Sequence, residues 1–96
     1  MSDVLVSCMI YVAGQGPNSR RAVQNLSDFC QKYLPKRHQV EVVDVLKNPE
    51  RALAEKVLLT PTLVIVTPLP RQIIVGDLSD IEVLHGALGP YEDRPL

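Results

Sequence analysis

One apolar stretch near the middle of the chain constrains the fold most strongly: residues 58–76, LLTPTLVIVTPLPRQIIVG. Its two β-branched runs, 63–66 and 73–75, contain no charged residue and are separated by a proline-containing loop. Short β-branched runs with proline between them are typical of paired strands rather than of a helix. Pro61, which has no N–H to give to a ladder, suits the start of a strand. The stretch therefore predicts a β-hairpin.

The first half of the chain predicts a strand, a helix and a second strand. Residues 4–12, VLVSCMIYV, form a nearly continuous apolar run, as expected of a central strand covered on both faces. In the helix that follows, apolar residues recur every three or four positions; Asn18 or Ser19 can cap it, and Pro35 ends it. A second strand spans 40–46. A strand–helix–strand unit of this length is most simply a parallel crossover.

A short helix is predicted between the second strand and the hairpin. Asn48, Pro49 and Glu50 supply a cap, a first-turn proline and a first-turn carboxylate, which together signal a helix start. The helix is predicted over 49–58. Its apolar side consists of Leu53, Val57 and Leu58.

A last helix is predicted after the hairpin, where Ser79 and Glu82 fit a capping box. Gly89 and Pro90 close that helix. The predicted order is thus β-α-β-α-β-β-α, an α/β fold in which a mixed sheet has helices on both faces. This thioredoxin-like βαβαββα arrangement follows from the pattern of elements alone.

Length and composition limit the function classes. Ninety-six residues, 46% of them hydrophobic, suffice for one domain but not for two separate cores. The formal net charge of −1 offers no basic footprint for nucleic acid or an anionic membrane. No apolar run is long enough to span a bilayer, and Asp3 in an N-terminus without basic residues argues against a signal peptide. A cytoplasmic protein is expected.

Residues able to catalyse a reaction or bind a metal are sparse. Cys8 and Cys30 lack partners at redox or metal spacing, so two buried free thiols are favoured over a disulfide or a reactive thiol. His38 and His85 likewise lack nearby ligands. Residues 16–19, GPNS, occupy the helix start where a thioredoxin-like redox protein carries Cys-x-x-Cys. No catalytic residue, metal or cofactor is therefore predicted.

Three short motifs give the chain a specific signature. They read YVAG followed by PNS within 11–19, VDVLKNP at 43–49, and LTPTL followed by GDLSD within 59–80. Together, and at this spacing over nearly the whole chain, they resemble the KaiB family of circadian-clock proteins. The resemblance implies a non-enzymatic clock component that binds the N-terminal ring of the hexameric ATPase KaiC. It further implies that such a protein sequesters KaiA and competes with the kinase SasA, whose sensor domain is thioredoxin-like.

The family is also known for fold switching, which the resemblance extends to this chain as an expectation. Residues 1–48 are expected to be common to both folds, residues 49–90 to be rebuilt, and residues 91–96 to form a frayed tail. The alternative fold is a ground state of order βαββααβ, usually a tetramer. The thioredoxin-like state is monomeric and binds KaiC.

The resemblance assigns roles to individual residues. Arg21 matches a family arginine implicated in partner contacts, and Lys56 matches a basic residue of the second helix that faces KaiC. Lys47, within the VDVLKNP motif, is grouped with them as a partner-binding residue. The prolines of the switching half are Pro61, Pro68 and Pro70.

The chain departs from the family pattern in the rebuilt half. The β-prone runs 64–66 and 73–75 replace a more polar pattern, and Gly89-Pro90 would interrupt a C-terminal strand of the alternative fold. Differences in strand propensity contribute about 1 kcal/mol each. They matter because two folds of one sequence can differ in free energy by only a few kcal/mol. We therefore expect a resting thioredoxin-like fold, monomeric or weakly associated, with the tetrameric ground state as the alternative. A KaiB-like paralogue with a stress-related partner is a second functional interpretation, and a thioredoxin-fold redox protein is a weaker third.

Overall fold

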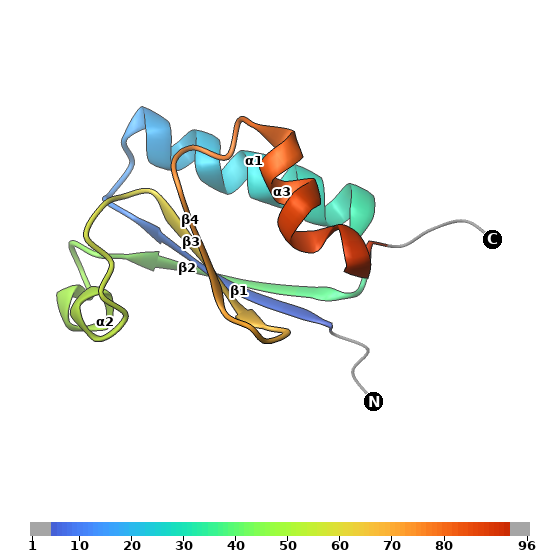
Figure 1. Ribbon diagram of the computed structural model, residues 1–96. Helices are drawn as coiled ribbons and strands as arrows, with labels where there is room; N and C mark the ends of the chain where they lie inside the picture. Colours follow the sequence, from blue (N-terminus) through green and yellow to red (C-terminus); the bar gives the residue numbers. More distant parts are fainter. Residues whose placement is uncertain (1–4, 93–96) are drawn as a thin grey trace.

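The computed structural model describes residues 5–92, which form one four-stranded sheet with helices on both faces (Figure 1). The predicted β-α-β-α-β-β-α order is confirmed, and one turn of 3₁₀ helix follows it. The elements are β1 (Val6–Val12), α1 (Pro17–Tyr33), β2 (His38–Asp44), α2 (Pro49–Ala54), β3 (Thr62–Thr67), β4 (Gln72–Val75), α3 (Ile81–Leu88) and η1 (Gly89–Tyr91).

The sheet order is β2-β1-β3-β4, so β2 and β4 are its two edges. Strand β1 runs parallel to β2 and antiparallel to β3, as the predicted crossover and central first strand require. Strands β3 and β4 form the predicted hairpin, with Leu63 opposite Ile74 and Val64 opposite Ile73. Pro61 lies buried immediately before β3, at the strand start where the sequence placed it.

The larger core lies between the sheet and the helices α1 and α3, which share one face (Figure 1). Alternation along β1 and β3 directs every second side chain into this layer. The sheet contributes Val6, Cys8, Ile10, Val12, Leu63 and Ile65 to this core. The helices and the loop before α3 contribute Ala22, Leu26, Phe29, Cys30, Leu34, Leu78, Leu84 and Leu88.

A smaller core lies on the opposite face, under α2. It consists of Tyr11, Val43, Ala52 and Val64, with four half-buried neighbours around them. Because α2 is only six residues long, it covers part of this face. On this side of the sheet the edge residues Ile73 and Val75 stay 52% and 56% exposed.

The predicted apolar side of α2 is wrong at two of its three residues. The helix ends at Ala54, and Lys56 follows with a positive φ of 58°. This turn breaks the helical periodicity, so Val57 reaches the smaller core while Leu58 is 90% exposed. Leu53 is 77% exposed, and Ala52 is the residue that α2 buries.

Two predicted helix caps also differ from the structure. Helix α1 begins at Pro17 after Gly16, two or three residues earlier than caps at Asn18 or Ser19 would give. Ser19 instead accepts a hydrogen bond from the N–H of Ala13 at 3.3 Å. Helix α3 is capped by Asp80 rather than by Ser79, because the Asp80 carboxylate accepts from the N–H of Glu82.

Burial of β3 predicts a large difference between two leucines. We expect Leu63→Ala, at a fully buried position, to lower the free energy of unfolding by about 2–5 kcal/mol. Leu58→Ala, at a position 90% exposed, should change it by less than about 0.5 kcal/mol. Urea denaturation followed by circular dichroism measures both. Equal costs for the two variants would contradict the strand arrangement.

Candidate functional site

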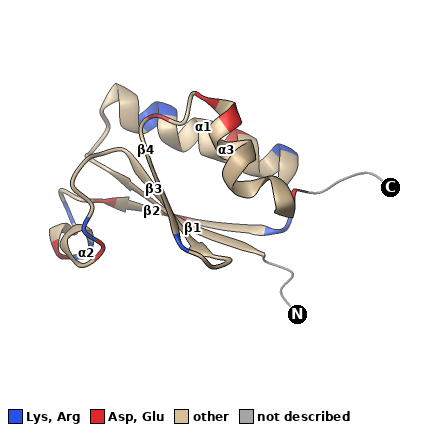
Figure 2. Ribbon diagram, viewed as in Figure 1, with Lys and Arg blue, Asp and Glu red and all other residues tan. Residues whose placement is uncertain are grey.

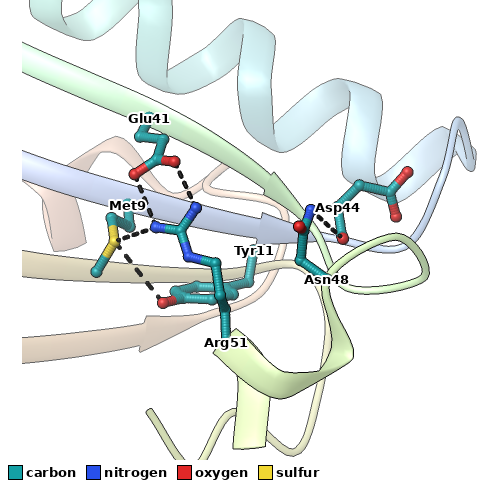
Figure 3. Close-up of polar contacts among 6 residues, drawn as sticks. All are labelled: Met9, Tyr11, Glu41, Asp44, Asn48 and Arg51. Carbon is teal, nitrogen blue, oxygen red and sulfur yellow. Dashed lines mark hydrogen bonds and ion pairs between the residues drawn. The ribbon is translucent and has the colours of Figure 1, made fainter. Parts of the chain in front are cut away.

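The guanidinium of Arg51 holds helix α2 against the sheet by contacts with strands β2 and β1 (Figure 3). Arg51 Nη1 and Nη2 donate to the two carboxylate oxygens of Glu41 on β2, at 2.5 and 2.8 Å. Arg51 Nη2 also contacts Met9 Sδ on β1 at 3.3 Å, and the hydroxyl of Tyr11 donates to the same sulfur at 3.7 Å. A bidentate pair fixes orientation as well as distance. The helix is therefore held in one position over the smaller core.

Asp44 fixes the loops at the start of α2. Its Oδ1 accepts from the N–H groups of Gly14 at 3.2 Å and Leu46 at 3.0 Å. Its main-chain oxygen accepts from the N–H of Asn48 at 2.9 Å and from Asn48 Nδ2 at 3.3 Å (Figure 3). One residue at the end of β2 thus joins the β1–α1 loop, the following turn and the first turn of α2.

Helix α2 and the segment that follows it carry three highly exposed leucines. Leu53 and Leu58 are 77% and 90% exposed, and Leu59 is 62% exposed. Lys56 lies exposed among them. We call Leu53, Lys56, Leu58 and Leu59 the α2 surface. Exposed large apolar groups that gather on one surface are typical of a protein docking site.

The predicted partner-binding residues fall at separate places. Lys56 belongs to the α2 surface, and Lys47 is exposed in the turn that precedes α2, so the two lysines lie at opposite ends of this helix. Arg21 is on α1, on the other face of the sheet (Figure 1). There it donates to Asn18 and forms an ion pair with Asp77 at 3.4 Å. The structure therefore does not gather the three cations into one site.

The three predicted switch prolines are all preceded by cis peptide bonds, at Thr60–Pro61, Thr67–Pro68 and Leu69–Pro70. Pro61 lies in the segment between α2 and β3, while Pro68 and Pro70 lie in the loop of the hairpin.

The sequence reasoning missed the pair formed by Arg51 and Glu41. The available signal was register: Glu41 alternates with Val43, so both point to the same face of β2. Arg51, the third residue of the short helix, could then have been placed opposite the acidic residue. A second missed ion pair, between Arg71 and Glu55, joins the end of the hairpin loop to the end of α2.

The ion pairs shift the pKa values of their carboxylates. The hydrogen bonds from Arg51 hold the pKa of Glu41 below its usual range, and the same bonds raise the pKa of Arg51. The pKa of Asp77 is also lowered, first by hydrogen bonds from Ser79 and then by Arg21. Both carboxylates stay ionised at neutral pH and hold segments together.

The two thiols are suppressed as nucleophiles. Cys8 on β1 and Cys30 on α1 are free and buried in the larger core, as predicted. Burial raises the pKa of Cys8 to about 12 and that of Cys30 to about 11. Because the thiolate is the reactive form, burial keeps both thiols protonated at neutral pH and disfavours their attack on a disulfide. Within residues 5–92 no group of three possible metal-ligating side chains is found, nor any helix long and apolar enough to cross a membrane.

His85 packs against two aromatic rings and contacts a carboxylate. Its ring lies edge-on to Phe29 and Tyr33, with centroids 5.0 and 4.6 Å away, and its Nδ1 is 2.9 Å from Glu92. The contacts join α3 to α1 and to the end of η1. His85 thus lies half-buried at the side of α3 that faces the aromatic rings of α1.

The Arg51–Glu41 pair leads to an acid-dependence prediction. We expect Arg51→Gln to raise the pKa of Glu41 toward about 4.3 and to speed hydrogen exchange of the α2 amides. Since the folded pKa lies below the unfolded one, the pair stabilises α2 above the unfolded pKa, and its effect is lost as the pH falls through the folded pKa. NMR titration of Glu41 measures the shift, with Arg20→Gln on α1 as the control. A Glu41 pKa unchanged by Arg51→Gln would contradict the anchor.

The buried thiols lead to the opposite dependence at high pH. Since the folded pKa values of Cys8 and Cys30 are raised, their contribution to stability is complete below about pH 8.5 and decreases as the pH rises toward 11–12. Between pH 9 and pH 10.5 the protein should therefore lose more stability than the variant with Cys8→Ala and Cys30→Ala. Urea midpoints at both pH values, with pH 7 as the baseline, give the comparison. If the protein and the variant lose the same stability between pH 9 and pH 10.5, the thiols are not what limits stability at alkaline pH.

Solved structures share this fold. The N-terminal domain of SasA from Synechococcus elongatus matches with a TM-score of 0.76 and 20% identity, over 92% of this chain and 83% of that domain. The Drosophila thioredoxin Deadhead matches with a TM-score of 0.74 and 19% identity, over 93% of this chain and 83% of that one. At such identities the likeness establishes the fold alone, and the expected thioredoxin-like class is confirmed.

Sequence relatives identify the family. The chain is 42% identical over 91 residues to the circadian clock oscillator protein KaiB of Synechococcus elongatus, covering 88% of this chain and 89% of that protein. It is 41% identical over 73 residues to the circadian clock protein KaiB3 of a Synechocystis strain, covering 76% and 72% of the two chains. The KaiB domain matches residues 9–89. The chain is therefore a member of the KaiB family of circadian-clock proteins.

Proposed function

We propose that this protein is a non-enzymatic clock component that docks through its α2 surface on the N-terminal ring of a KaiC-type ATPase. The observation that carries the proposal is the exposure of Leu53 on α2 and of Leu58 and Leu59 just after it, beside a helix that Arg51 anchors to Glu41. Family membership supplies the class of partner. The protein acts in the cytoplasm and needs no cofactor.

Docking on this surface is driven by apolar burial. Each leucine that leaves water contributes about 25 cal/mol per Å² of apolar area, so three of them give a compact centre to the interface. Lys56 within the surface and Lys47 at the other end of α2 favour an acidic partner surface and speed encounter. Because the Arg51–Glu41 pair already orders the helix, little further ordering is needed on binding.

Likeness to the SasA domain supports competition for the same ring. Two modules of one fold can present the same surface to one partner, and the TM-score of 0.76 makes their backbones closely comparable. Sequestration of KaiA would use a different surface of the ring-bound protein, and Arg21 on the opposite face is our candidate for a second partner contact.

Rebuilding of residues 49–90 into the βαββααβ ground state belongs to the same proposal. That segment contains α2, the hairpin and the cis prolines Pro61, Pro68 and Pro70, so refolding it would remove the α2 surface altogether. Docking then selects the thioredoxin-like state, since a ligand favours the state that displays its site.

The absence of a reactive thiol disfavours a redox function. Neither cysteine lies at the start of α1, where a thioredoxin activates its nucleophile, and burial raises the pKa of both. A partner outside the clock remains the competing outcome of the binding experiment below.

Binding to a KaiC-type hexamer in the presence of a slowly hydrolysed ATP analogue tests the proposal. We expect Lys56→Glu and Leu58→Asp each to weaken binding at least tenfold, because one reverses a steering charge and the other places a carboxylate in an apolar contact. The matched controls are Lys32→Glu on α1 and Ile81→Asp on α3, which should bind like the parent protein. Biolayer interferometry measures all five proteins. Failure of the parent protein to bind at high micromolar concentration would contradict the proposal.

A further inference from the structure

The two edges of the sheet differ in how they are protected. Edge strand β2 carries His38, Glu41 and Asp44 and follows a basic turn, whereas β4 consists of Gln72-Ile73-Ile74-Val75 without a charge or a proline (Figure 2). Natural sheets use charged residues, prolines and bulges to keep edge strands from pairing with another chain. Strand β4 has none of these, and its length of four residues is the one protection it has, so the edge is available for pairing.

Backbone alternation shows which groups β4 presents to solvent. The N–H of Gly76 donates to the main-chain oxygen of Pro61 at 3.0 Å, so this opposed pair is a hydrogen-bonded one. Hydrogen-bonded pairs recur at every second residue of an antiparallel ladder, which makes Ile74 the next one. The N–H and C=O groups of Ile73 and Val75 therefore point away from β3. No described strand lies beyond them.

The side chains around this edge are apolar on both faces of the sheet. Ile73 and Val75, on the α2 side, are 52% and 56% exposed. On the α3 side, Ile74 and Val83 line part of a cavity of about 260 Å³. Open backbone groups, exposed β-branched side chains and an adjoining cavity thus coincide at one strand.

We propose that β4 pairs antiparallel with β4 of a second copy of this chain, about a two-fold axis that passes beside Ile74. In this register Ile73 lies opposite the partner's Val75, and Val75 lies opposite the partner's Ile73. All four outward N–H and C=O groups of each copy then form hydrogen bonds, four in total across the interface. Ile74 lies opposite the partner's Ile74, next to the cavity.

Other symmetric registers are less favourable. A two-fold axis at Ile73 would set Val75 opposite the partner's Arg71, and an axis at Val75 would set Ile73 opposite the partner's Asp77, so a charge would face an apolar side chain. An axis between Ile73 and Ile74 would oppose outward groups with groups already bonded to β3. The register at Ile74 alone matches apolar with apolar and donor with acceptor.

The contact is small, and this sets its strength. Four residues on each copy bury much less than the roughly 800 Å² per partner of a stable interface. The dimer should therefore form only at high protein concentration. An isologous contact closes at two copies, so no larger species follows from it. The inference uses β4 and the α3 side and does not depend on the proposed ring partner.

Sedimentation across a concentration series tests the pairing. We expect the apparent mass to rise with concentration toward twice the monomer mass. Ile73→Lys should abolish the rise, because each copy would then place a lysine opposite the partner's Val75. Gln39→Lys places the same charge on the opposite edge strand and should leave the rise intact. A mass that stays constant, growth beyond two copies, or loss of the rise in Gln39→Lys would overturn the proposal. Circular dichroism of both variants checks that they remain folded.

Cross-linking tests the register directly. Non-hydrogen-bonded pairs place Cα atoms about 4.5 Å apart, within the range of a disulfide, so Ile74→Cys should link two copies under mild copper-catalysed air oxidation. Gln72→Cys would lie opposite the partner's Gly76 and should link at least tenfold more slowly. Peptide mapping identifies the linked residues and excludes the buried native thiols. Equal rates for the two variants, or faster linking by Gln72→Cys, would overturn the Ile74 register.

Discussion

Burial of β3 is the interaction on which the rest of the structure depends. This strand lies between β1 and β4 in the sheet, and its side chains alternate between the two cores: Leu63 and Ile65 face α1 and α3, while Val64 faces α2. Both hydrophobic clusters therefore include β3. An uncharged β-branched run satisfies both sides at once, because either face of the strand can be covered by apolar neighbours. Without β3 neither the hairpin edge nor the support under α2 would exist.

The exposed surface of α2 is a consequence of the same arrangement. The smaller core needs only Ala52 and Val57 from this region, so a helix of six residues is long enough to cover Tyr11 and Val43. Leu53 on this helix and Leu58 just after it stay in water. Arg51 compensates for the short helix by reaching Glu41 across the sheet. A short, well-anchored helix with apolar residues on its outer side is suited to recognition rather than to core packing.

Local signals in the sequence were sufficient for the element order but not for the details of α2. The hairpin, the strand start at Pro61 and the central position of β1 follow from β-branched runs and proline placement, which are properties of adjacent residues. The end of α2 depends on the positive φ of Lys56, and no composition signal marks it. The Arg51–Glu41 contact depends on strand register between distant segments. The resemblance to the KaiB family pointed to Lys47, Lys56 and Arg21, yet only the folded chain separates Arg21 from the other two.

Backbone NMR chemical shifts of the free protein in dilute solution test most directly whether residues 62–75 form two paired strands. The account predicts extended shifts over 62–67 and 72–75, with cross-strand contacts between the amide or α protons of Leu63 and Ile74. Helical shifts across 64–75, the signature of a rebuilt second half, would contradict it.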